Sequence, residues 1–177
     1  AEAEAALGVI RILVNNAGIS YRAVLEHMSD MDEQAQFATN YFGPVGLIRL
    51  VLPYMREVGR GKIINVSSVS GMLAMPTMSA YSASKHALEG ASEALWYELK
   101  PLGVNVSLIQ PGFINSQSFL KVRYTKKSDP NASHGGPYGD YYENMTPFIA
   151  RLMNLSLTTP EQVAQKILKV IQTENPP

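Results

Sequence analysis

The sequence predicts an α/β fold in which a parallel sheet is covered on both faces by helices. Three short runs of apolar and β-branched residues lack the polar alternation of a half-exposed strand, which is typical of strands buried on both sides. Long segments with helical periodicity separate these runs, and strands that alternate with helices pair in parallel through right-handed crossovers. A chain of 177 residues is long enough to bury a substantial core within one domain.

The first predicted strand covers residues 9–15, and the segment after it has the pattern of a long helix. This helix runs from Ser29 or Asp30 to about Val58, with acidic residues in its first turn and glycines after its end. Gly43-Pro44 lies inside the helical segment. We expect a kink there, because proline has no amide N–H for the helical hydrogen bond.

Two further strands and a second long helix follow. The strands are predicted at residues 62–68 and 104–110, and the helix between them from Ser79 to about Leu99. Residues 116–148 are rich in Ser, Gly, Pro and Tyr without a sustained period, so we expect mostly loop there. Because long loops in compact domains are commonly functional, we interpret residues 117–158 as a substrate loop or lid.

A last helix begins with a capping box. Thr159 is the expected cap, Pro160 the first helical residue, and Gln162 the residue that completes the box.

Composition excludes several classes of function. Fifteen basic and fifteen acidic side chains cancel, so nothing indicates a nucleic-acid partner or an anionic membrane surface. The chain has no cysteine for a disulfide or thiolate site, and its three histidines are isolated, so we expect no metal. No apolar run approaches the roughly 20 residues of a transmembrane segment, so we expect a cytoplasmic location.

The three strands all end in polar or glycine-rich residues, and ligands of open parallel sheets bind beyond the carboxyl ends of the strands. Tyr81 and Lys85 stand one helical turn apart near the start of the second long helix, at this same edge. A phenol beside an ammonium can act as a proton donor, since the positive charge favours the phenolate. Together these features predict an active site at the carboxyl edge of the sheet.

Several motifs recur here in one order and spacing, namely "LVNNAG", "ATNYFGP", "INVSS", "YSASK" and "PGFINS". With them, from about Val9 to Ser116, the chain resembles the short-chain dehydrogenases/reductases. The resemblance implies a Rossmann-like, doubly wound parallel sheet in three α/β/α layers. It also implies an NAD- or NADP-dependent oxidoreductase that transfers a hydride between the cofactor and an alcohol or ketone.

The resemblance further implies a role for each motif residue. Tyr81 would be the general acid/base, Lys85 would lower its pKa and bind the nicotinamide ribose, and Ser68 would stabilise the substrate oxygen. Asn40 would hold a water of the proton relay. Ser116 stands where the family usually has threonine. The implied cofactor-binding residues are Asn15, Asn16, Ala17, Gly18, Tyr81, Lys85, Pro111, Gly112, Ile114 and Ser116.

One departure from the family pattern concerns the beginning of the chain. No glycine-rich phosphate motif precedes the first strand, so we expect that the N-terminal part of the sheet is missing. Residues 1–177 are interpreted as a single partial domain, the catalytic half, and alone they are not expected to turn over substrate. In the family the two long helices pair with their copies, which implies a homodimer or homotetramer.

Alternatives remain open on three points. The protein is either an enzyme or a non-catalytic relative that keeps the fold for binding or assembly. The substrate is either an apolar alcohol or ketone, such as a steroid, retinoid or fatty acyl group, or a carrier-linked oxoacyl group. The basic cluster and the tyrosines after Gly112 either line the substrate site or form a solvated face and local packing; they are Lys121, Arg123, Lys126, Lys127, Tyr124, Tyr138, Tyr141 and Tyr142.

Overall fold

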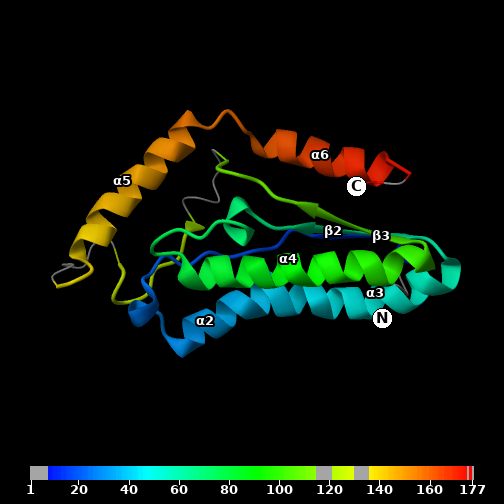
Figure 1. The fold of residues 1–177 in the computed structure, drawn as a ribbon, viewed down its shortest axis with the longest axis horizontal. Coiled ribbons are helices and arrows are strands. Elements are labelled where there is room, and N and C mark those ends of the chain that lie inside the picture. Colours follow the sequence, from blue (N-terminus) through cyan, green and yellow to red (C-terminus); the bar gives the residue numbers. More distant parts are fainter. Residues whose placement is uncertain (1–7, 115–120, 130–135, 175, 177) are drawn as a thin grey trace.

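The computed structural model describes residues 8–114, 121–129, 136–174 and 176. Three parallel strands form one sheet in the order β1-β2-β3. Helix α6 covers one face, and helices α3 and α4 cover the other, so the described structure has three layers (Figure 1). The strands are β1 (Ile12–Asn15), β2 (Gly61–Val66) and β3 (Val104–Ile109). The predicted α/β fold with a parallel sheet is confirmed.

The helices account for most of the remaining described chain. They are η1 (Leu25–His27), α2 (Asp30–Phe37), η2 (Ala38–Phe42), α3 (Gly43–Val58), η3 (Val69–Gly71), α4 (Ser79–Leu99), η4 (Lys100–Leu102), α5 (Gly139–Leu155) and α6 (Pro160–Gln172). Among the described residues, none of these helices is both long and apolar enough to cross a membrane.

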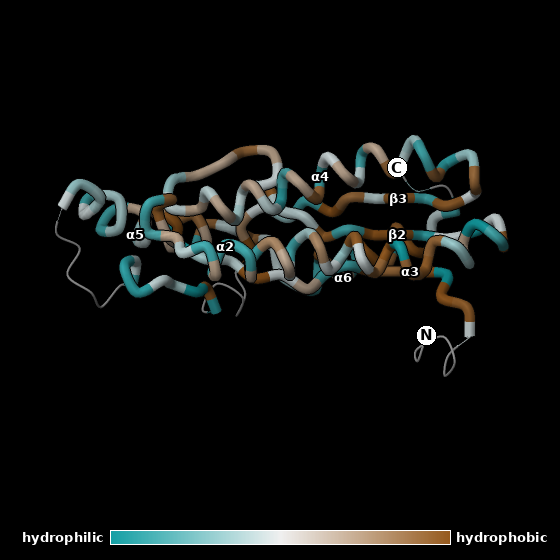
Figure 2. Tube along the Cα trace, turned by 90° about the horizontal axis from the view of Figure 1, so that it is seen from below, coloured by the Kyte–Doolittle hydropathy of each residue, from teal (hydrophilic) through white to brown (hydrophobic). Residues whose placement is uncertain are grey.

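Strand β2 lies at the centre of the sheet and alternates between two cores. Ile63 packs against α3 and α4, whereas Ile64 and Val66 pack against α6. The strands therefore carry the apolar segments seen along the sheet in Figure 2. The predicted burial of the second and third strands on both faces is confirmed.

The first strand departs from its prediction. It begins at Ile12 rather than at residue 9, and Ile12 and Val14 are 44% and 37% exposed. The described side chains of α6 pack on β2 and β3, so in this structure they leave the outer part of that face uncovered. The expectation that this strand is buried on both faces is therefore wrong for these residues.

The first long helix is broken where the sequence predicted a kink. Ser29 caps it, since its Oγ accepts the Asp32 N–H at 3.1 Å. The turn η2 is π-helical, and the Gly43 N–H bonds to the Ala38 oxygen five residues back. Pro44 cannot donate a hydrogen bond to the Asn40 carbonyl, because proline has no N–H. The break therefore falls on the turn that carries Asn40.

The last two helices show one failure and one success of the sequence prediction. Residues 139–148, expected to be loop, form the first part of α5. Pro147 inside this helix hid its period, although the buried Tyr142 and Ile149 lie two turns apart on one face. In contrast, the capping box of α6 is formed as predicted: the Thr159 Oγ1 accepts the Gln162 N–H at 3.3 Å, and the Gln162 Oε1 accepts the Thr159 N–H at 3.0 Å.

Candidate active site

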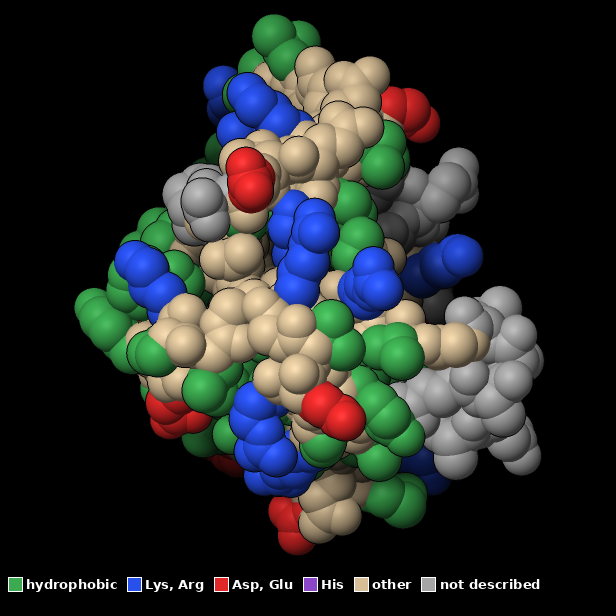
Figure 3. Space-filling view, turned by 90° about the vertical axis from the view of Figure 1, so that its right-hand side faces the viewer, with side chains coloured by type: hydrophobic (Ala, Val, Ile, Leu, Met, Phe, Trp, Pro, Cys, Tyr) green, Lys and Arg blue, Asp and Glu red, His purple; other side chains and the backbone are tan. Residues whose placement is uncertain are grey.

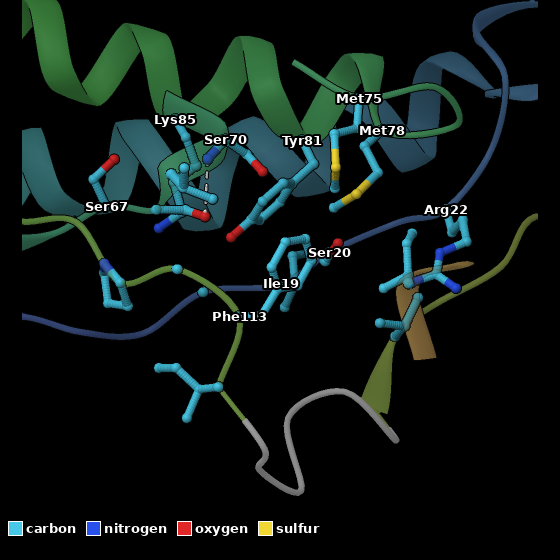
Figure 4. Close-up of a pocket in the computed structure, with 18 of the residues that line it drawn as sticks. Ile19, Ser20, Arg22, Ser67, Ser70, Met75, Met78, Tyr81, Lys85 and Phe113 are labelled. Carbon is cyan, nitrogen blue, oxygen red and sulfur yellow. Dashed lines mark hydrogen bonds between the residues drawn. The ribbon is translucent and has the colours of Figure 1, made fainter. Parts of the chain in front are cut away.

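A cavity of about 450 Å³ opens at the carboxyl ends of the three strands. Its wall combines the strand ends with the start of α4, with α5 and with residues 121–123, as Figure 4 shows for its central part. The lining residues are Asn16, Gly18, Ile19, Ser20, Arg22, Val66, Ser67, Ser68, Val69, Ser70, Met75, Met78, Tyr81, Lys85, Pro111, Gly112, Phe113, Ile114, Lys121, Val122, Arg123, Ile149 and Met153. The carboxyl edge predicted from the sequence is thus where the cavity lies.

Tyr81 extends into this cavity from the first turn of α4 (Figure 4). Burial raises the pKa of Tyr81, and its hydrogen bond with Ser68 acts in the opposite direction. Ser68 is held at the start of η3, where its Oγ also accepts the Ser70 N–H at 3.2 Å. Burial is the largest influence on the pKa of Tyr81 in this structure, and the lowering of that pKa by Lys85 stays a prediction.

Lys85 lies one turn further along α4 and is buried. Its ammonium donates a hydrogen bond to the Val66 oxygen at 2.9 Å and lies 6.0 Å from the centroid of the Tyr81 ring. Burial lowers the pKa of Lys85 to about 8, and the nearby Glu89 charge opposes this effect.

Asn40 is fixed behind the end of β1. Its Nδ2 donates to the Ile19 oxygen at 2.9 Å and to the Ser84 Oγ at 3.0 Å, while its Oδ1 accepts the Ile19 N–H at 2.9 Å. A Cβ atom placed on Gly18 would lie 3.5 Å from the Asn40 Oδ1 and 3.7 Å from the Lys85 Nζ. Asn40 and Lys85 thus both lie next to Gly18.

A second amide network supports the sheet next to the site. Asn15 donates to the Asn65 Oδ1 at 2.8 Å, and Asn65 donates to the Ser92 Oγ at 2.8 Å. Both asparagines are buried, and Asn15 does not line the cavity. Asn15 therefore ties β1 to β2, and Asn65 ties β2 to α4, which keeps the ends of these strands in place.

Most of the predicted cofactor-binding residues line the cavity, namely Asn16, Gly18, Tyr81, Lys85, Pro111, Gly112 and Ile114. Ala17 is exposed on the same turn but is not part of the wall, and Ser116 lies outside the described residues. The Lys85 ammonium has three N–H donors, and one of them bonds to the Val66 oxygen. The donors of Lys85 therefore suit the hydroxyl groups of a nicotinamide ribose.

Met75 and Met78 lie in the Leu- and Met-rich segment 71–78, whose composition fits an apolar substrate. Ile149 and Met153 of α5 and Arg22 after β1 line the cavity but were not singled out from the sequence. The sequence signal that could have identified Arg22 is its place as an arginine soon after the end of the first strand. Figure 4 shows the two methionines between Tyr81 and Arg22.

The tyrosines after Gly112 make local contacts where the structure places them. Tyr142 stacks on the His27 ring at a centroid distance of 5.6 Å, and its hydroxyl lies 2.8 Å from the His27 Nδ1. Tyr138 donates a hydrogen bond to Glu26 at 2.6 Å. These contacts hold the start of α5 against η1. Within the described part of the chain, no three metal-ligating side chains gather at one place.

Basic side chains gather at the opposite end of the sheet, in the face that Figure 3 shows. A hollow of about 960 Å³ lies there beside the amino ends of the strands, and its basic lining residues are Arg11, Arg60, Lys62 and Lys100. The Lys62 ammonium donates to the carbonyls of Ile171 and Thr173, at the end of α6. This charge thus stabilises a helix end, and the hollow lies away from Tyr81.

Comparison with known proteins identifies the family to which the chain is similar. Residues 1–127 match the model of the short chain dehydrogenase family. An uncharacterised oxidoreductase, YusZ of Bacillus subtilis, is 37% identical over 169 residues, which are 96% of this chain and 59% of the relative. The 3-ketodihydrosphingosine reductase of Bacteroides thetaiotaomicron is 35% identical over 96% of this chain and 61% of its own. The chain thus spans about 60% of the length of these relatives.

Solved structures show the same fold. A short-chain dehydrogenase from Streptomyces avermitilis superposes with a TM-score of 0.79 at 32% identity, over 99% of this chain and 61% of that one. A gluconate 5-dehydrogenase from Burkholderia cenocepacia, in complex with NADP and tartrate, superposes with a TM-score of 0.64 at 35% identity. The match covers 66% of this chain and 46% of that one. A 4-hydroxyisoleucine dehydrogenase complexed with NADH superposes with a TM-score of 0.73 at 26% identity. The match covers 98% of this chain and 66% of that one.

Proposed function

The chain belongs to the short-chain dehydrogenase family, and from that premise we propose that the complete protein is an NAD- or NADP-dependent oxidoreductase acting on an alcohol or ketone. The observation that carries the proposal is the meeting of Ser68, Tyr81 and Lys85 in one cavity, with Asn40 next to Gly18. Similar proteins have been solved with NADP and with NADH.

Tyr81 is proposed as the general acid/base. A bound reduced nicotinamide would supply the hydride that the carbonyl carbon of the substrate accepts, and the Tyr81 hydroxyl would give its proton to the carbonyl oxygen. Because burial raises the pKa of Tyr81, the phenol keeps its proton at neutral pH and has one to donate. The Ser68 hydroxyl, which bonds to Tyr81, is placed to hydrogen-bond the same substrate oxygen as negative charge develops on it.

Lys85 and Asn40 are proposed to hold the cofactor ribose and to return the proton to Tyr81. Lys85 provides donors for the ribose hydroxyls and a positive charge that favours the phenolate after proton transfer. Pro44 has no N–H for the ordinary helical bond to the Asn40 carbonyl, and this oxygen is proposed to bind the water of a proton relay. Pro111, Gly112 and Ile114 are proposed to flank the nicotinamide.

The substrate is proposed to be largely apolar. Met75, Met78, Phe113, Ile149 and Met153 make up much of the cavity wall around Tyr81. One relative is named a reductase of 3-ketodihydrosphingosine. A homodimer or homotetramer and a cytoplasmic location stay predictions.

Substitution of Tyr81 in the complete protein tests the function. Tyr81→Phe keeps the ring and removes only the proton, so we expect loss of at least about 1,000-fold in kcat with nearly unchanged cofactor binding. Turnover is measured with NADH and NADPH on a straight-chain methyl ketone, and binding by quenching of protein fluorescence.

The matched control is Tyr97→Phe, which alters an exposed tyrosine on the same helix and should leave turnover unchanged. Residual activity of Tyr81→Phe within tenfold of the parent would contradict the assigned role. A complete protein that binds neither cofactor would instead support the alternative of a non-catalytic relative.

A further inference from the structure

The lining of the cavity is positively charged. Four cationic side chains belong to it, Arg22, Lys85, Lys121 and Arg123, and none of the described residues that line it is acidic. Lys85 lies at the end where the cofactor is proposed to bind. The other three lie together on the segments 20–22 and 121–123, which form the opposite part of the wall.

Backbone pairing holds these two segments together. The Arg22 N–H bonds to the Arg123 oxygen at 2.9 Å, and the Arg123 N–H bonds to the Ser20 oxygen at 2.8 Å. The guanidinium of Arg123 lies 5.8 Å from the centroid of the Tyr21 ring. The cationic end of the cavity is therefore a built feature of the fold, made by residues about one hundred positions apart in the chain.

Arg22 differs from its two neighbours in being buried, at 3% exposure. A guanidinium keeps its proton under all ordinary conditions, and taking its charge out of water is costly. Burial accordingly acts to lower the pKa of Arg22, opposed by a hydrogen bond with the Tyr124 side chain. A carboxylate or phosphate next to a buried guanidinium forms strong, charge-assisted and often bidentate hydrogen bonds.

From this geometry we propose that the far end of the cavity binds an anionic group of the substrate, a carboxylate or phosphate, and that Arg22 selects it. The proposal rests on the oxidoreductase function proposed above. Figure 4 shows Met75 and Met78 between Tyr81 and Arg22. The substrate class is therefore a ketone or alcohol joined through an apolar segment to an anionic end.

The test uses the complete protein and matched ketones of increasing chain length, beginning with levulinate. At each chain length three straight-chain methyl ketones are compared. One ends in a carboxylate, one in the neutral methyl ester of that acid, and one in a phosphate. We expect one chain length at which kcat/KM for an anionic ketone exceeds that for the neutral ester by about 10-fold to 100-fold, the size of one or two charged hydrogen bonds. The carboxylate and phosphate arms show which anion is preferred.

Arg22→Met removes the charge and keeps an apolar side chain of similar length. It should lower kcat/KM for the anionic ketone by about 10-fold or more, as the loss of a charged hydrogen bond implies, and leave the neutral ester within threefold. Arg22→Lys should restore part of the preference. The paired control is Lys126→Met with Lys127→Met, because both lysines are exposed and lie outside the cavity lining.

Three outcomes would overturn the proposal: equal kcat/KM for anionic and neutral ketones at every chain length, equal losses on both in Arg22→Met, or equal losses in the lysine controls. If Arg22→Met fails to fold, Arg123→Met at the exposed edge of the same end must reduce the anionic preference instead. The proposed function fails separately, since it requires that Tyr81→Phe abolish turnover of the neutral ester too.

Discussion

Lys85 illustrates how a single buried charge depends on its neighbour. Glu89 follows it by one turn of α4, is itself buried, and accepts a hydrogen bond from the Gln110 Nε2 at 2.7 Å. Burial alone favours the neutral amine, and the Glu89 carboxylate favours the ammonium. Because the pKa of Lys85 is lower in the folded chain than in the unfolded one, the charged lysine costs stability below pH about 8. Stability is regained as the pH rises from there toward the ordinary value of a lysine.

We predict that Glu89→Gln in the complete protein lowers the pKa of Lys85 further. If the ammonium is the active form, the decline of kcat/KM on the alkaline side then moves to lower pH. The measurement is a pH profile of kcat/KM for ketone reduction. Glu93→Gln is the control, as this glutamate is exposed one turn further along the helix. Coincident alkaline limbs for the parent and Glu89→Gln would contradict the role of Glu89.

Helix α5 brings part of the cavity wall from a distant place in the sequence. Ile149 and Met153 line the cavity, and the start of the helix is held by Tyr142, whose hydroxyl accepts the Val24 N–H at 3.1 Å and lies within hydrogen-bond distance of His27. These two bonds join α5 to the segment that leads into α2. The Tyr142 hydroxyl therefore helps to hold the substrate side of the cavity in place.

Tyr142→Phe should lower the free energy of unfolding by about 1–2 kcal/mol, because the Val24 N–H loses its acceptor. We also expect faster hydrogen exchange at the amides of α5 and a higher KM with little change in kcat. Tyr141→Phe is the adjacent control on an exposed tyrosine. Equal denaturant midpoints for the two variants would show that the Tyr142 hydroxyl does not hold the helix.

The sequence predicted those elements whose signals are local. Helix α4 and the capping box of α6 have such signals, and the pairing of Tyr81 with Lys85 needs only one helical turn. Helix α5 was not predicted, since Pro147 interrupts its pattern. Arg22 was not predicted as a lining residue, because its position depends on pairing with residue 123. The direction of the Tyr81 pKa followed from burial, which a sequence does not give.

At the scale of the whole molecule, one face of α3 is apolar and exposed. Leu47, Leu50, Tyr54 and Val58 are 48%, 65%, 43% and 49% exposed and recur at helical spacing. Neighbouring α4 exposes Tyr97 as well. Surfaces of this kind are typical of contacts between subunits.

We predict that the complete protein forms a dimer or tetramer through this face and that Leu50→Glu shifts it toward monomer. Light scattering at micromolar concentration measures the change. Leu157→Glu provides the control, because this leucine is exposed outside α3 and α4. A parent protein that is monomeric under these conditions, or a Leu50→Glu variant with unchanged mass, would rule out this face as the interface.

The parallel register of the sheet also governs how the chain reaches its fold. Ile12 pairs with Lys62 and Lys62 with Asn105, so every strand contact closes a loop that contains a whole helix. Folding rates fall as contacts become more distant in sequence, because the entropy of loop closure is lost before the contact forms. Helices α3 and α4 can form early from local contacts, whereas β1 must wait for β2. During synthesis each of these two strand contacts must therefore wait until a whole helix has been made, and an apolar strand that is still unpaired is at risk of pairing with another chain.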